Sequence, residues 1–115
     1  MVREKYRYIV CQIENVREPS IISEKSLYRA LQSCADAVLT DWEYAAVFPK
    51  TKMAEYFPYN RLGIFKVPLI GKRAAIRALE EIREIDNFAC SVRPIKTSGI
   101  IKKARKWIIE NIHKK

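Results

Sequence analysis

Residues 95–107 read IKTSGIIKKARKW, a strand-like run that breaks at a Ser-Gly pair and then continues as a basic helix. The pair predicts a sharp turn, because Gly99 tolerates positive φ and Ser98 can bond a nearby backbone amide. Beyond the turn, apolar residues recur at helical spacing, at Ile101, Ala104, Ile108 and Ile112, with Trp107 at the margin. The segment therefore predicts a strand, a tight turn and a helix that docks by one side.

The other side of this helix carries cations. They are Lys102, Lys103, Arg105 and Lys106, and Lys96 precedes the turn. From residue 93 onward the chain has eight Lys or Arg and one acidic residue, so most of its formal net charge of +9 lies in the last fifth. This concentration favours association with a polyanion, above all nucleic acid, and the free N–H groups of the first helical turn suit a phosphate. The alternative is a charged face that is merely solvated, as most are.

Outward from this segment, alternating apolar residues predict strands over 6–16, 61–69 and 88–98. Residues 44–51 predict a short strand near a sheet edge, because Pro49 interrupts it, and residues 52–60 predict an exposed loop.

Helical spacing predicts two further helices, one from Ser23 to about Asp41 and one over 72–85. The order is β-α-β-β-α-β plus a C-terminal helix. We therefore predict one α+β domain over residues 1–115, a ferredoxin-like (RRM-like) sandwich in which residues 99–115 form the basic helix. Two helices cover one sheet face, and the other face stays open unless the extra helix or a partner covers it.

No residue pattern predicts catalysis or metal binding by this chain. Cys11, Cys34 and Cys90 are far apart and lie in apolar patterns, which indicates reduced core residues of a cytoplasmic protein. His113 is the only histidine and has no local carboxylate or cysteine beside it. No signal peptide or membrane span is visible, and the basic helix lacks the large apolar face that membrane-surface helices show.

The chain resembles the component 2 protein family of archaeal and eukaryotic ribonuclease P, whose eukaryotic members also serve the MRP particle. The segments that carry the resemblance occur in family order, as REKYRYIVCQIE, SEKSLYRALQSCADAV, GIFKV, RAAIRALEEI and VRPIKTSGIIKKARK. One departure is Ile100, which stands where the family usually has Thr in Ser-Gly-Thr-Ile. That change puts residue 100 in doubt as a binding residue and leaves Ser98, Gly99 and Lys102 aligned.

The resemblance implies an RNA-binding subunit that supports a catalytic RNA in removing the 5′ leader from precursor tRNA. The RNA uses the magnesium, so we expect no cofactor on this chain and only indirect contact with precursor tRNA. The resemblance also implies a TIM-barrel protein partner, with component 2 present as a pair of heterodimers. A protein-binding adaptor and a small independent enzyme on the same scaffold are the alternatives.

The candidate site residues follow from the basic first strand and the closing segment. We expect RNA contacts from Arg3, Lys5, Arg7, Arg93, Lys96, Ser98, Gly99, Lys102, Lys103, Arg105 and Lys106. We expect partner contacts from Tyr6, Tyr8 and Val10, which would be costly to leave exposed, and from Phe65, as a core or interface residue. Stacking on RNA bases is the alternative role of Tyr6 and Tyr8. The two helices and the 52–60 loop are alternative places for the partner.

Overall fold

The computed structural model describes residues 5–16, 22–48 and 50–112. Arg3 and His113 lie outside these residues. In chain order the elements are β1 (Tyr6–Glu14), α1 (Glu24–Val38), α2 (Asp41–Val47), β2 (Lys52–Phe57), β3 (Leu62–Pro68), the short 3-10 helix η1 (Leu69–Gly71), α3 (Lys72–Glu80), β4 (Glu84–Ile85), β5 (Phe88–Ala89), β6 (Ser91–Ser98) and α4 (Ile101–Ile112).

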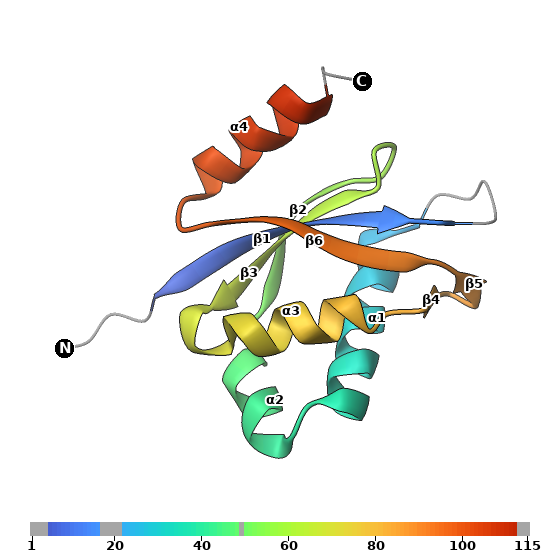
Figure 1. The fold of residues 1–115 in the computed structure, drawn as a ribbon, viewed down its shortest axis with the longest axis vertical. Helices are drawn as coiled ribbons and strands as arrows, with labels where there is room; N and C mark the ends of the chain where they lie inside the picture. Colours follow the sequence, from blue (N-terminus) through green and yellow to red (C-terminus); the bar gives the residue numbers. More distant parts are fainter. Residues whose placement is uncertain (1–4, 17–21, 49, 113–115) are drawn as a thin grey trace.

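The main sheet has the strand order β2-β3-β1-β6, and all its neighbours are antiparallel. Helices α1, α2 and α3 lie on one side of the sheet and α4 lies on the other (Figure 1). This arrangement confirms the predicted ferredoxin-like α+β fold with an added C-terminal helix. The face that two helices alone would leave open is partly covered by α4.

The predicted strand over 44–51 and loop over 52–60 are wrong. Helix α2 begins after Thr40, whose hydroxyl accepts from the Glu43 amide while the Glu43 carboxylate accepts from the Thr40 amide. This reciprocal capping box overrides the strand propensity of the aromatic residues that follow. Strand β2 then pairs with β3 along the edge of the sheet, with a register shift between Met53 and Glu55.

The predicted 72–85 helix ends earlier than expected, at Glu80. A two-stranded hairpin, β4–β5, follows, and its turn residues Asp86 and Asn87 have φ of 53° and 69°. Asp and Asn tolerate this left-handed backbone, which a tight hairpin turn requires. The chain then enters β6, which pairs with β1.

Two apolar layers hold the fold together. The larger lies between the sheet and helices α1 to α3, and it contains Ile9, Leu31, Phe65 and Leu79. The smaller lies between the sheet and α4, where Val10, Leu62 and Ile64 of the sheet pack with Ala104 and Ile108 of α4. Alternate residues of β1 therefore serve opposite layers, as the period of a strand requires.

Gly71 lies where two segments approach closely. A Cβ at this position would stand 2.7 Å from the Ala46 carbonyl oxygen and 3.0 Å from Val47 Cγ2. Because the nearest atom is helix backbone, Gly71→Ala is expected to lower the free energy of unfolding by about 1–3 kcal/mol. Gly99→Ala is the matched control, since its Cβ would meet only the Arg7 side chain at 3.6 Å. Equal urea midpoints for the two variants would contradict the close approach.

Burial raises the pKa of the Cys11 thiol to about 12, and a hydrogen bond with the Gly63 backbone opposes the shift in part. The folded state therefore keeps this proton above pH 9, where the unfolded chain loses it. The contribution of Cys11 to the free energy of unfolding is fully present below about pH 9. It falls by about 1.4 kcal/mol per pH unit as the pH rises towards 12. Urea unfolding between pH 8 and pH 10 should show a shallower decline in Cys11→Ala than in the parent chain. Parallel declines would show that Cys11 does not carry this linkage.

Candidate nucleic-acid interface

The turn between β6 and α4 is fixed by Ser98. The Ser98 hydroxyl accepts from the Ile100 amide at 3.2 Å and donates to the Ile100 carbonyl at 3.0 Å. Gly99 does not adopt positive φ, so the predicted sharp turn forms without that conformational freedom. The predicted side-chain bond from Ser98 to a nearby amide is present, and it brings the end of β6 directly to the start of α4.

Helix α4 docks by one side and exposes its cations on the other. Ala104 and Ile108 are fully buried against the sheet, and Ile101 is half-buried. The side chains of Lys102, Lys103, Arg105 and Lys106 are all exposed. The docked side follows the predicted stripe as far as Ile108, and the exposed cations lie outside this stripe.

Ion pairs divide these cations into two groups. Arg105 pairs with Glu55 of β2, Arg93 Nη2 lies 2.8 Å from Glu14 Oε1, and Lys106 Nζ lies 4.0 Å from Glu110 Oε1. In the described part of the chain, no carboxylate oxygen lies within 4.0 Å of the ammonium groups of Lys96, Lys102 or Lys103. These three lysines hold the most available positive charge at this end of the molecule.

The start of β1 brings further cations to the same turn. Tyr8 pairs with Ser98, so the residues that precede Tyr8 lie beside the β6–α4 turn. Lys5 is exposed, and the Arg7 guanidinium lies against Gly99 while its Nη1 donates to the Tyr6 carbonyl at 2.9 Å. Lys5 and Arg7 therefore share one end of the sheet with the unpaired lysines.

Burial corrects the expected partner contact of Val10 and places Phe65 in the core, which is one of its two predicted roles. Val10 and Phe65 are 0% exposed, Val10 beneath α4 and Phe65 beneath the helices of the opposite layer. Neither side chain offers surface to another molecule. Tyr6 and Tyr8 are half-buried, and the Lys66 ammonium lies 4.4 Å from the centre of the Tyr6 ring.

Lys52 and Lys66 are cations that the sequence prediction missed. The register places Lys52 opposite Lys66, Lys66 opposite Tyr8, and Tyr8 opposite Ser98. Directly paired residues of a sheet point to the same face, so this row crosses all four strands on the face that α4 occupies. The alternation within GIFKV, once paired with a neighbouring strand, is the signal that would have found Lys66.

A groove runs between α4 and the end of β6. It has a volume of about 650 Å³, and its walls include Lys96, Ser98, Lys103, Lys106 and Trp107. Volumes of this size are typical of ligand sites. The groove joins cationic, hydroxyl and aromatic groups, which suits binding to a phosphate-bearing ligand.

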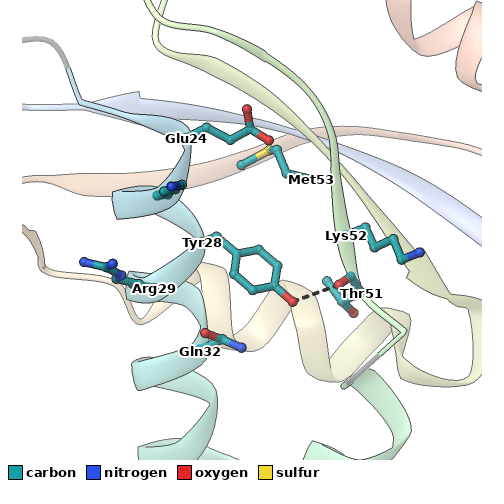
Figure 2. A pocket seen from close by; sticks show the side chains of 8 residues that line it. Glu24, Tyr28, Arg29, Gln32, Thr51, Lys52 and Met53 are labelled. Atoms are coloured by element: carbon teal, nitrogen blue, oxygen red, sulfur yellow. Dashed lines mark hydrogen bonds between the residues drawn. The ribbon is translucent and has the colours of Figure 1, made fainter.

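A second hollow, of about 410 Å³, lies at the opposite edge of the sheet between α1 and β2 (Figure 2). Figure 2 shows the Tyr28 ring crossing from α1 towards β2, where its hydroxyl donates to the Thr51 carbonyl at 2.9 Å. Glu24 and Lys52 contribute opposite charges to its walls. Burial raises the pKa of the Tyr28 hydroxyl, with a smaller contribution from Tyr44. A neutral tyrosine bonded to a carbonyl holds the two elements together.

The described residues contain no group of three or more His, Cys, Asp or Glu side chains placed to hold a metal ion. Burial also raises the pKa values of the Cys34 and Cys90 thiols, which disfavours the reactive thiolate.

Within the described residues, no helix is both long and apolar enough to cross a membrane.

The model of the Rpp14/Pop5 family matches residues 7–109 of this sequence, which is nearly its whole length. The chain belongs to the Rpp14/Pop5 family. Proteins of this family are subunits of the ribonucleoproteins RNase P and RNase MRP. The resemblance seen in the sequence is thereby confirmed at the level of this family.

A chain in the cryo-EM structure of yeast ribonuclease MRP has a similar fold. The TM-score is 0.68 at 10% sequence identity, and the match covers 99% of this chain and 93% of that chain. At this identity the likeness establishes the fold. No curated protein matches the sequence.

Proposed function

We propose that this chain is the component 2 type of RNase P protein, an RNA-binding subunit that supports the catalytic RNA as it removes the 5′ leader of precursor tRNA in the cytoplasm. Chemistry belongs to the RNA and its magnesium ions, and the chain contacts precursor tRNA only through the assembled particle. Membership of the Rpp14/Pop5 family supports a place in an RNase P or MRP ribonucleoprotein.

The observation that carries the proposal is the set of unpaired lysines at the β6–α4 turn. Lys96, Lys102 and Lys103 are exposed without a carboxylate within 4.0 Å among the described residues, and Lys5 and Arg7 lie beside them. Folded RNA packs its phosphates densely, and their mutual repulsion opposes folding. Cations held on a rigid protein surface offset this repulsion and reduce the magnesium that the RNA needs.

We infer a TIM-barrel protein as the second partner, with two such heterodimers in the particle. Burial of Val10 and Phe65 removes them from this contact. Candidate surfaces for it are the exposed parts of Tyr6 and Tyr8, residues 52–60, and the helices on the face opposite α4. A protein contact on these helices leaves the cations of α4 free for RNA.

A reconstitution tests the proposal. Catalytic RNA and the other protein subunits are assayed for precursor-tRNA cleavage at low magnesium, with and without this chain. The proposal predicts that the chain alone has no activity and that it raises cleavage in the mixture. Binding without any change in rate would overturn the catalytic support and leave a protein-binding adaptor. Turnover by the isolated chain would favour an independent enzyme.

A further inference from the structure

The groove at the β6–α4 turn continues past Trp107 into another hollow, of about 670 Å³, beside the C-terminal half of α4. Trp107 belongs to the walls of both, so the two hollows follow one flank of α4 from its first turn towards its C-terminal end. The Trp107 side chain is half-buried and packs on the apolar layer beneath α4. Part of the ring therefore remains available to a ligand lying in the groove.

The two halves of this groove differ in chemistry. The first half carries Lys96, Lys103 and Lys106, with Glu110 as its acidic group. The second half carries one ion pair, Arg93 with Glu14, and four side-chain carboxamides, which are Gln12, Asn15, Asn60 and Asn111. Tyr59 stands at its rim with 88% of its surface exposed. Phosphate-binding cations, aromatic rings and carboxamides are thus aligned along one path.

Hydrogen bonds fix how two of the carboxamides can act. Gln12 Nε2 donates to the carbonyls of Asn60 at 2.9 Å and Arg61 at 3.2 Å. Asn111 Nδ2 donates to the Trp107 carbonyl at 2.7 Å. Because a backbone carbonyl can only accept, these bonds orient both amides and present their two oxygens as acceptors, while Asn111 Nδ2 keeps one further N–H. A ligand in this half therefore meets two oriented acceptor atoms.

We propose that this groove binds unpaired nucleotides of single-stranded RNA. The phosphates contact Lys96, Lys103 and Lys106, one base stacks on the exposed part of Trp107, and an exocyclic amino group donates to the oxygens of Gln12 and Asn111. Adenine, cytosine and guanine carry such a group and uracil does not, so the groove prefers them to uracil. Bases inside an RNA duplex are already stacked and paired, so a duplex does not fit this path. The inference rests on the proposed function only for the choice of RNA as ligand.

Single-tryptophan variants of the full chain test the proposal, because Trp42 and Trp107 are its only two tryptophans. Trp42 is 85% exposed on α2, on the opposite side of the sheet from α4 (Figure 1). Trp42→Phe leaves Trp107 as the reporter, and Trp107→Phe leaves Trp42 as the matched control. Each variant is titrated with short oligo(A), oligo(C), oligo(U) and a duplex RNA of equal length, and fluorescence anisotropy of labelled RNA measures binding independently.

The expected result is quenching of Trp107 by oligo(A) and oligo(C), weaker quenching by oligo(U), and an unchanged signal from Trp42. Lys96→Ala in the Trp42→Phe background should shift the quenching curve about 5-fold to higher RNA concentration. Binding of single strands and duplex with equal affinity and no Trp107 signal would overturn the groove while leaving the proposed RNA-binding function intact. Quenching of Trp107 by a chain that fails in reconstitution would instead reject the RNase P function and retain the groove.

Discussion

Replacement of Lys96, Lys102 and Lys103 by alanine is expected to weaken binding to the catalytic RNA by about 100-fold at ~0.15 M salt. Each lysine–phosphate contact releases close to one counterion, so three lost contacts lower the slope of log affinity against log salt by about 2–3 units. These lysines are chosen because no carboxylate lies within 4.0 Å of them among the described residues. Filter binding or anisotropy across a salt series measures both quantities.

Two controls separate local contact from overall charge. Replacement of Lys25, Arg29 and Arg73 by alanine removes the same charge from exposed positions of α1 and α3. The double variant Arg105→Ala with Glu55→Ala removes one ion pair and no net charge. Both should keep a slope close to that of the parent chain. Equal losses from the two triple variants would mean that affinity follows net charge, and the β6–α4 surface would lose its special role.

The order of the main elements was predictable from the sequence because most of them have a strong period. The alternation in β1 and β3 and the helical spacing in α1 and α4 each agree with the observed elements. The prediction for residues 44–60 was wrong for a specific reason. The Thr40-Asp41-Trp42-Glu43 capping box starts a helix, but the aromatic and β-branched residues after it suggested a strand. Local capping chemistry outweighed average propensity there.

The candidate site was predictable in its charge and not in its pairings. The cations of residues 96–106 are visible in the sequence as a run. The partner of Arg105, Glu55, lies far away in the chain and in a segment expected to be a loop. Lys52 and Lys66 join the same face only through the register of three strand pairs. The neutralisation of Arg105 by Glu55 and the placing of Lys52 and Lys66 on one face both depend on the folded sheet. Local sequence patterns therefore do not reveal them.

Val10 and Phe65 are buried by different elements of the fold. A strand residue that faces away from the layer under α1 to α3 is available to a partner unless another element covers it, and α4 covers Val10. Phe65 is the opposite case, because its alternation with Lys66 already assigns it to one face. Whether Phe65 is a core or an interface residue depends on the helices of that face, and these helices bury it completely.

Phe65→Ala is therefore expected to lower the free energy of unfolding by about 3–5 kcal/mol, through lost burial and the cavity that remains. Phe65 is among the largest fully buried side chains of the described residues, and its strand pairs with β1 on one side and β2 on the other. Typical domains are stable by only about 5–15 kcal/mol, so this single change removes a large share. Thermal and urea unfolding of the isolated chain measure the loss.

Tyr59→Ala is the matched control, because it truncates another aromatic side chain that is 88% exposed. Its effect on the free energy of unfolding should stay within about 0.5 kcal/mol. Phe65→Leu, which retains most of the apolar volume, should cost less than Phe65→Ala, because the cavity is smaller. If Phe65→Ala instead left the isolated chain as stable as Tyr59→Ala but abolished binding of a protein partner, Phe65 would be an interface residue. The packing of β3 under the helices would then have to open on assembly, because a fully buried ring cannot contact a partner in any other way.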